Sequence, residues 1–252
     1  MVKNLQKSFG YRTVAEGEKT FLVKSVFEEV ARRYDLMNDL MSFGVHRLWK
    51  HELIKMIRPR ENMHLLDLAG GTGDIACRFL KTTQEFKGCS ATVVDINHAM
   101  ILQGESRAID QGIINGLTWI VADGATLPFK DQSFDTCTIS FGLRNFTYIE
   151  ESLKEILRIL KPGGFFFCLE FSKVSSKIFD KLYRFYSFEV IPRIGEMVAN
   201  NKSAYQYLVE SIDRFYTQDE LKSLMTTTGY QNVAYQNLSG GVAAIHSGQK
   251  LT

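Results

Sequence analysis

Asp67-Leu-Ala-Gly-Gly-Thr-Gly73 is the clearest indication of the fold in this sequence. A short apolar run at 63–68 leads into it, and a helical pattern begins at Asp74 directly after it. Small residues between a buried strand and a helix allow a ligand to approach the backbone at the helix N-terminus. The stretch therefore predicts the first strand, turn and helix of an α/β sheet, with a ligand site at the carboxyl ends of its strands.

Strands and helices alternate outward from this loop. Strands are predicted at 63–68, 91–95, 117–121, 134–140, 165–170, 233–237 and 242–247. Helices are predicted from 74, after 97, at 147–160 and at 217–229, with capping boxes at Thr147 and Thr217. Residues 161–164, Lys-Pro-Gly-Gly, are expected to form a break before the fifth strand. This alternation predicts an α/β fold with a seven-stranded, mostly parallel, doubly wound sheet.

Two segments lie outside this alternation. Residues 1–60 are expected to form a helical cap, with a loose polar arm at 1–20, a helix from Lys24 and a second helix at 45–57. A helical insertion is predicted at about 175–215, within the main domain at 61–252. The cap and the main domain are expected to work as a single functional unit.

Composition excludes several classes of protein. The 252 residues are 45% hydrophobic and 23% charged, which is typical of a soluble globular protein rather than a disordered or collagen-like one. The net charge of +2 gives no electrostatic reason to expect a nucleic-acid partner. The four cysteines form no C-x-x-C pair, and the histidines show no metal-ligand spacing, so reduced thiols and no metal site are expected.

The glycine loop fits two kinds of ligand. Gly71, Gly73 and Ala76 match the G-x-G-x-x-A fingerprint of dinucleotide sites, and Asp95 follows Gly73 by 22 residues. An acid at the end of the second strand can hold ribose hydroxyls in either a nicotinamide or an adenosyl cofactor. A glycine turn without any ligand is a third interpretation.

Asp67 favours the adenosyl cofactor. A carboxylate beside the loop would repel a pyrophosphate, whereas it would attract the cationic methionine end of S-adenosylmethionine (SAM). Asp123, after the third strand, can accept a hydrogen bond from the adenine amino group. This arrangement resembles the class I SAM-dependent methyltransferases, which have a Rossmann-like fold.

Four longer motifs resemble a particular family. They are residues 34–49 (YDLMNDLMSFGVHRLW), 140–145 (SFGLRN), 158–172 (RILKPGGFFFCLEFS) and 191–195 (IPRIG). They are similar to the UbiE family, the C-methyltransferases of ubiquinone and menaquinone biosynthesis, and the resemblance covers about 9–250. Cys168 departs from the family pattern, where an aliphatic residue is expected. The resemblance implies SAM-dependent methylation of a polyprenylated benzoquinol, of demethylmenaquinol, or of both.

The loop and the resemblance together define the expected sites. The expected cofactor-binding residues are Asp67, Gly71, Thr72, Gly73, Asp95, Asp123, Gly124 and Ser140. The expected catalytic residues, which activate the acceptor hydroxyl, are Arg144, Asn145, Tyr34, Asp35 and His46. Arginine stays protonated, so Arg144 would stabilise a phenolate rather than remove its proton. The alternatives are a loop-holding salt bridge for Arg144 and helix packing for His46.

The insertion suggests how a lipid acceptor is reached. It is rich in aromatic residues, and Lys173, Lys177, Lys181 and Arg184 would share one helical face. We expect the insertion to be either a lid packed on the core, or a wall for the polyprenyl tail with a basic surface for anionic headgroups. The expected location is therefore cytoplasmic and peripheral to the bacterial inner membrane, or the matrix face of the membrane in mitochondria.

Three other hypotheses remain open at this stage. The first is a SAM methyltransferase of another acceptor, such as a sterol or a small phenol. The second is a non-catalytic scaffold that binds SAM within a quinone-biosynthesis assembly. The third concerns partners: the chain could act as a homodimer or as a component of such an assembly.

Overall fold

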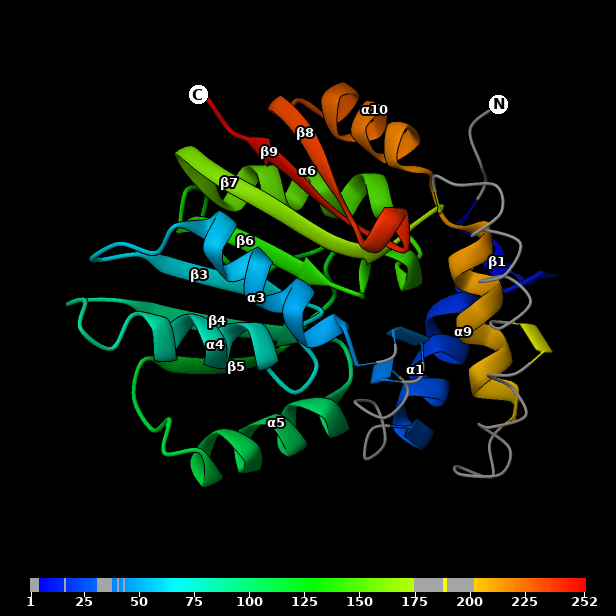
Figure 1. Ribbon diagram of the computed structural model, residues 1–252, viewed down its shortest axis with the longest axis horizontal. Helices are drawn as coiled ribbons and strands as arrows, with labels where there is room; N and C mark the ends of the chain where they lie inside the picture. Colours follow the sequence, from blue (N-terminus) through cyan, green and yellow to red (C-terminus); the bar gives the residue numbers. More distant parts are fainter. Residues whose placement is uncertain are drawn as a thin grey trace.

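A seven-stranded sheet forms the centre of the protein, with strand order β5-β4-β3-β6-β7-β9-β8 (Figure 1). The computed structural model describes residues 5–15, 17–30, 38–39, 41–42, 44–174, 188–189 and 202–252. The strands of the sheet are β3 His64–Leu68, β4 Ser90–Asp95, β5 Leu117–Val121, β6 Phe134–Ser140, β7 Leu160–Phe171, β8 Gln231–Leu238 and β9 Ala243–Gln249. The first five strands in this order pair in parallel, and β9 pairs antiparallel with both neighbours. The predicted doubly wound, mostly parallel sheet is confirmed.

Both faces of the sheet are covered by helices. They are α3 His46–Ile57, α4 Asp74–Thr82, α5 His98–Asp110, α6 Ile149–Ile159 and α10 Gln218–Thr228. Leu65 belongs to the hydrophobic core that includes α3 and α4, whereas its neighbour Leu66 belongs to the core that includes α6 and α10. Successive strand residues point to opposite faces, so an uninterrupted apolar run is what a strand buried on both faces requires. This is why the short apolar runs predicted the strands correctly.

The N-terminal prediction was partly wrong. Instead of a loose arm at 1–20, the chain forms a hairpin of β1 Ser8–Phe9 and β2 Arg12–Thr13, and α1 Glu18–Val30 begins before the predicted Lys24. Tertiary contacts order this polar stretch. The Lys19 ammonium is buried and donates hydrogen bonds to the carbonyl oxygens of Leu5 and Phe146, at 2.9 and 2.7 Å.

One predicted capping box is correct and the other is wrong. Thr217 and Glu220 form both reciprocal hydrogen bonds at the start of α10, which ends at Gly229. By contrast, α6 begins after Tyr148 without a side-chain cap. The Thr147 hydroxyl instead hydrogen-bonds the Thr20 hydroxyl of α1 at 2.8 Å, so a contact from the N-terminal helix takes the place of the local cap.

The fifth strand of the sequence prediction, now β7, also begins earlier than predicted. It starts at Leu160 and runs through the glycine pair that was expected to form a break. The Gly163 amide donates to the Lys250 carbonyl at 2.7 Å, and the Lys250 amide donates to the Gly164 carbonyl at 2.9 Å. A C-terminal segment distant in sequence therefore satisfies the backbone of these glycines and keeps them in the sheet.

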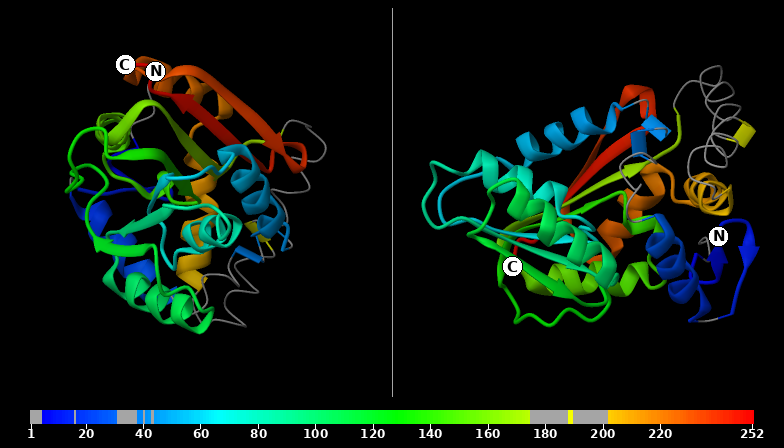
Figure 2. Two further views of the ribbon diagram at one scale, coloured as in Figure 1. Left: turned by 90° about the vertical axis from the view of Figure 1, so that its left-hand side faces the viewer. Right: turned by 90° about the horizontal axis from the view of Figure 1, so that it is seen from below.

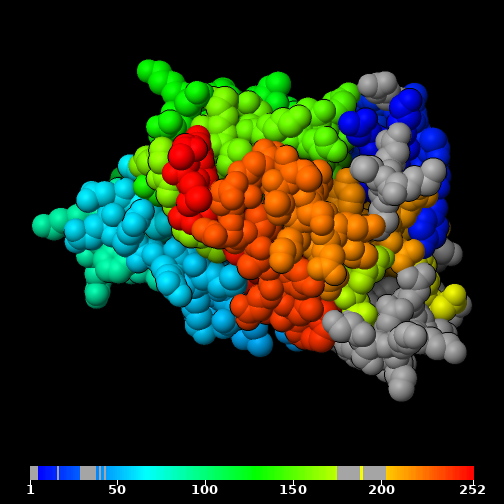
Figure 3. All heavy atoms as spheres, turned by 90° about the horizontal axis from the view of Figure 1, so that it is seen from above, coloured from blue at the N-terminus to red at the C-terminus, as the bar shows by residue number. Residues whose placement is uncertain are grey.

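The N-terminal hairpin, α1 and α9 Lys202–Arg214 lie together beyond one end of the sheet, as Figure 1 and the right-hand view of Figure 2 show. Figure 3 shows the blue N-terminal residues beside orange residues of α9 at that end of the molecule. Most of the predicted insertion, 175–187 and 190–201, lies outside the described residues. Lys173 lies before it in a non-helical segment and pairs with Asp213, so its predicted place on a basic helical face is wrong. No described helix is long and apolar enough to span a bilayer.

Candidate functional site

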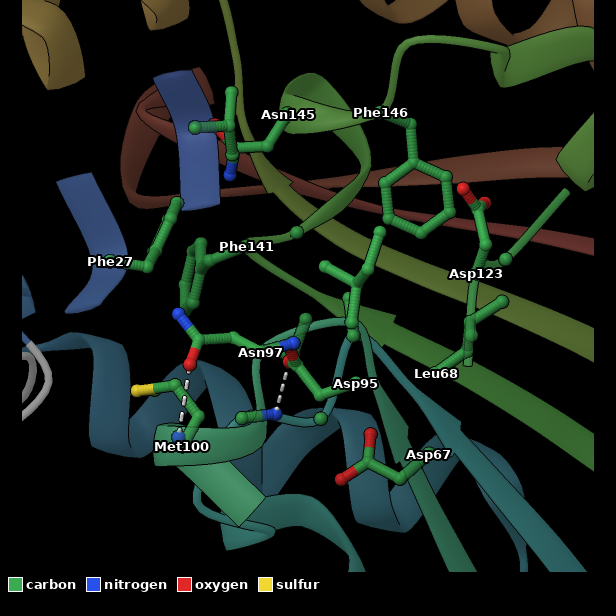
Figure 4. A pocket seen from close by; sticks show the side chains of 18 of the residues that line it. Phe27, Asp67, Leu68, Asp95, Asn97, Met100, Asp123, Phe141, Asn145 and Phe146 are labelled. Atoms are coloured by element: carbon green, nitrogen blue, oxygen red, sulfur yellow. Dashed lines mark hydrogen bonds between the residues drawn. The ribbon is translucent and has the colours of Figure 1, made fainter. Parts of the chain in front are cut away.

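A cavity opens at the carboxyl ends of the parallel strands, beside the glycine loop (Figure 4). Its walls come from α1, α3, the loops after β3, β4, β5 and β6, and the start of α6. Of the expected site residues, the cavity is lined by Asp67, Gly71, Thr72, Asp95, Asp123, Gly124, Ser140 and Asn145. The fold thus brings together residues from four strand ends, as the sequence predicted for an open α/β sheet.

Asp67 ends β3 beneath the glycine loop and is buried. Its carboxylate accepts hydrogen bonds from the Ala76 amide at 3.2 Å and from the Thr138 hydroxyl at 3.0 Å. Burial nevertheless raises the pKa of Asp67 to about 7, because removal from water disfavours the charged form more than these two bonds favour it. A bound cation at this point would compensate for the missing solvation.

Asp95 ends β4 on the other side of the loop. Its two oxygens accept hydrogen bonds from the Gly71 amide at 2.9 Å and from the Asn97 amide at 2.8 Å. Desolvation raises the pKa of this carboxyl to about 6. The Asp95 side chain therefore holds the glycine loop in place, and each of its oxygens has a second lone pair available to a hydroxyl group.

A third part of the cavity has the features of a pocket for a flat, apolar group. Asp123 lies at its rim, and Phe146 packs over Gly124 (Figure 4). A Cβ atom added to Gly124 would lie 2.6 Å from the Phe146 ring, so only glycine allows this close approach. Sequence reasoning missed Phe146 and Met100 as cavity residues, although Phe146 directly follows the Arg-Asn pair that it singled out.

Gly73 does not line the cavity. It caps α4 with φ of 71°, in the left-handed region, and a Cβ atom there would lie 2.5 Å from the Trp119 ring. Its role in the structure is to let the turn close and α4 pack against the sheet. Ser140, by contrast, lines the cavity, and its buried hydroxyl has no hydrogen-bond partner among the described residues.

Arg144 is fully buried next to the cavity rather than in its wall. In the short helix η2 Leu143–Asn145, its Nη1 lies 2.6 Å from Glu170, while its Nε and Nη2 have no hydrogen-bond partner in the described part of the chain. Burial raises the pKa of Glu170, although the guanidinium opposes this shift. The structure thus contains the salt bridge that was the alternative to a catalytic role, and it leaves two donor nitrogens for a further partner.

Of the remaining catalytic candidates, only His46 lies among the described residues, and it does not line this cavity. His46 lies on α3, where it is buried and bonds Asp39 at 2.9 Å, and it lines a separate cleft together with Arg47, Arg78 and Arg107. Burial is the main cause that lowers the pKa of His46, so its neutral form is favoured. Tyr34 and Asp35 lie outside the described residues.

This combination fits SAM better than a dinucleotide. Asp67 and Asp95 place two carboxylates beside the glycine loop, where a pyrophosphate would be repelled and an ammonium or ribose hydroxyls would be bound. Phe146, Leu68 and Met100 give apolar contacts for a flat ring. The unpartnered Ser140 hydroxyl offers a further hydrogen bond.

The fold and the site together define a class I SAM-dependent methyltransferase. Solved structures share this fold at low sequence identity. A SAM-dependent methyltransferase of Thermotoga maritima, described as a possible histamine N-methyltransferase, has a TM-score of 0.60 and 20% identity, over 90% of this chain and 99% of that one. A chain in the complex of the Haloferax volcanii Trm112 activator with a putative methyltransferase has a TM-score of 0.62 and 17% identity, over 90% and 98%.

The chain belongs to the ubiE/COQ5 methyltransferase family, whose model matches residues 12–250. It is 49% identical to the ubiquinone/menaquinone biosynthesis C-methyltransferase UbiE of Rickettsia bellii, over 98% of this chain and 99% of the relative. It is 47% identical to the mitochondrial 2-methoxy-6-polyprenyl-1,4-benzoquinol methylase of Mus musculus, over 96% and 84%. The family predicted from the four motifs is confirmed, and the protein is a SAM-dependent C-methyltransferase.

SAM affinity is expected to increase as the pH rises from 5.5 to 7. Because burial raises the pKa of Asp67 to about 7 and that of Asp95 to about 6, both carboxyls bind protons in this range. The cationic ligand favours the ionised forms, so binding should release protons and tighten by roughly one to two orders of magnitude over this range. Calorimetry in buffers of different ionisation enthalpy measures both effects, and Asp67→Asn should flatten the dependence. Constant affinity without proton release would contradict this account.

Proposed function

We propose that this enzyme transfers a methyl group from SAM to a ring carbon of a polyprenylated benzoquinol, of demethylmenaquinol, or of both. One observation carries the proposal: over nearly its full length, about half of this chain is identical to relatives that are named for these reactions. The cavity geometry agrees with it, because Asn145 lines the same cavity as Asp67 and Asp95. Acceptor and cofactor would therefore meet in one enclosed space.

The acceptor has to be activated before its carbon can attack. Each open ring carbon is ortho to a hydroxyl group, and loss of that proton makes the carbon an enolate-like nucleophile. A phenol with a pKa of about 10 is ionised to only about 0.1% at pH 7, which is a deficit of roughly 4 kcal/mol. Hydrogen-bond donors or a cation beside the oxygen recover part of this deficit.

Asn145 and Arg144 are the groups placed to do this. The Asn145 amide lines the cavity and can donate a hydrogen bond to the developing phenolate. Arg144, immediately before it, adds positive charge that its ion pair with Glu170 only partly neutralises, since two guanidinium nitrogens remain unpartnered among the described residues. Water is the direct proton acceptor in this proposal, because a guanidinium does not lose its proton.

The cofactor site of this proposal uses the residues already described. SAM supplies an electrophilic methyl group when bound. Asp67 would hold its ammonium, Asp95 its ribose hydroxyls, and Asp123 with Phe146 its adenine, while Thr72 and Ser140 would give further polar contacts; all six residues line the cavity. These residues orient the donor against the acceptor, and the reaction needs no metal ion.

The acceptor lipid implies contact with a membrane surface. In α1, Val23 and Phe27 line the cavity, and Phe21 on the same helix is 69% exposed. These apolar side chains of α1 lie between the cavity and the solvent, where they could contact a polyprenyl tail that remains partly in the bilayer. We place the enzyme peripherally on the bacterial inner membrane, or on the matrix face in a mitochondrion.

Only the reduced acceptor is expected to react. The oxidised quinone ring is electrophilic and has no phenolic proton to lose, so its ring carbon cannot attack the methyl group. The test is methyl transfer from labelled SAM to a short-chain demethyl quinone analogue, assayed under anaerobic reducing and under oxidising conditions. Turnover of the quinol alone supports the proposal.

The same assay has two contrary outcomes. Equal turnover of quinone and quinol contradicts the phenolate mechanism. No turnover of either, by an enzyme that binds SAM, contradicts the proposed acceptor. Mass spectrometry of quinones in cells lacking the protein then distinguishes benzoquinol from naphthoquinol as the natural acceptor, because the corresponding demethyl species accumulates.

A further inference from the structure

Asn145 is held by a side chain from a distant part of the chain. The Tyr207 hydroxyl of α9 donates a hydrogen bond to the Asn145 Oδ1 atom, with an oxygen–oxygen distance of 2.9 Å. Tyr207 is buried, and desolvation raises the pKa of its phenol, so the hydroxyl keeps its proton and remains a donor. The Asn145 Nδ2 makes no hydrogen bond to a described residue, although Asn145 lines the cavity.

The N-terminal hairpin fixes the position of Tyr207. The Phe9 ring of β1 stacks on the Tyr207 ring, with centroids 4.2 Å apart and an angle of 16° between their planes. The Tyr11 amide donates to the Glu210 carboxylate at 2.9 Å, and the Tyr11 hydroxyl donates to Asp213 at 2.7 Å. The hairpin thus binds α9 at three points, and α9 presents one hydroxyl group to the active-site loop.

We infer that Tyr207 is a positioning residue for catalysis: its hydroxyl fixes the amide plane of Asn145 so that the NH₂ group is directed to the acceptor oxygen. This inference rests on the proposed function of Asn145. An asparagine amide can present either its oxygen or its NH₂ group to the cavity, and only the NH₂ group stabilises a phenolate. In the structure Oδ1 accepts the tyrosine proton, which leaves the NH₂ group for the cavity; in the reverse orientation the hydroxyl would have to turn and accept from the NH₂ group, and Oδ1 would face the acceptor oxygen.

Loss of this hydroxyl group should affect turnover rather than cofactor binding. In Tyr207→Phe the ring, and with it the stacking on Phe9, is kept, but the Asn145 amide is free to rotate. Turnover is expected to fall about tenfold to a hundredfold, since misorientation of one group reduces the rate to this extent. SAM affinity is expected to stay within about twofold, because no cofactor residue is touched.

Tyr230→Phe is the matched control. Tyr230 is also buried, and its hydroxyl donates a hydrogen bond of the same length, 2.9 Å, but to the Leu153 carbonyl; neither residue lines the cavity. Tyr230→Phe should lower the stability of the protein about as much as Tyr207→Phe does, and it should leave turnover unchanged. Equal loss of turnover in both variants would show that the effect is only structural and would overturn the inference.

A double-mutant cycle tests whether Tyr207 acts through Asn145. Asn145→Ala removes the amide, so adding Tyr207→Phe to it should change turnover by no more than about twofold. Multiplicative effects of the two substitutions would overturn the inference. Wild-type inactivity on the quinol would contradict the proposed acceptor instead, and then a second measurement decides about Tyr207.

This second measurement needs no acceptor. The side-chain NH₂ signals of Asn145 in a nitrogen-15 spectrum are identified by their loss in Asn145→Ala. One sharp pair is expected in the wild type and in Tyr230→Phe, with broadening or a shift in Tyr207→Phe. Identical NH₂ signals in Tyr207→Phe and the wild type would overturn the inference whatever the substrate is.

Discussion

Asp95→Ala is expected to weaken SAM binding by about 30- to 1000-fold. The substitution removes the proposed acceptor for the two ribose hydroxyls, and charge-assisted hydrogen bonds of this kind are worth roughly 2–4 kcal/mol together. It also frees the Gly71 and Asn97 amides that Asp95 holds at 2.9 and 2.8 Å, so the glycine loop loses its fixed shape. Isothermal titration with SAM measures the loss.

Two further variants sharpen this experiment. Asp110→Ala makes the same chemical change at the exposed end of α5 and should bind SAM like the wild type. Asp95→Asn keeps the size of the side chain but not its charge, so it should lie between wild type and Asp95→Ala. Unchanged SAM affinity in Asp95→Ala, or tight NADH binding without SAM binding in the wild type, would contradict the assignment of this site.

Arg144→Ala is expected to lower both stability and turnover. The substitution leaves Glu170 buried without its partner, which costs about 3–5 kcal/mol of unfolding free energy. In measurements on the folded variant at low temperature, the activation free energy of turnover should rise by roughly 2–4 kcal/mol, while SAM affinity changes little. Denaturant unfolding and a SAM titration measure the two effects separately.

The pH dependence separates the structural effect from the catalytic one. A carboxyl whose pKa is higher in the folded than in the unfolded state stabilises the fold at low pH, and this contribution is lost as the pH rises through the folded pKa. Burial already raises the pKa of Glu170, and loss of the guanidinium raises it further. Arg144→Ala should therefore be most destabilised at high pH, and Arg144→Ala/Glu170→Gln should recover part of the stability.

Turnover should increase as the pH rises, whereas stability decreases. A higher pH ionises the acceptor without help, so the double variant should regain part of its activity as the pH rises. Arg144→Lys should rescue only partly, because an ammonium lacks the planar fork of the guanidinium. If turnover of the folded variants stays near that of the wild type, Arg144 is only a structural residue.

Local sequence patterns were enough to predict the sheet and the edge of it at which the cavity lies. Strand ends in a parallel sheet meet at one edge, so the order of the elements alone predicted that Asp67, Asp95 and Asp123 would lie together, and all three line one cavity. Patterns of this kind are local: an apolar run followed by a glycine turn and an acid depends on neighbours within a few residues. The capping box at Thr217 is correct for the same reason.

The surroundings of residues 144–147, by contrast, depend on contacts with distant parts of the chain. Thr147 forms a sequence pattern for a cap but bonds Thr20, and Arg144 pairs with Glu170 on a strand that follows it by 26 residues. Asn145 is bonded by Tyr207, 62 residues further along the chain, which is itself stacked on Phe9. Hydrogen-bond partners of polar side chains depend on which distant segments pack together, and no local periodicity encodes that packing.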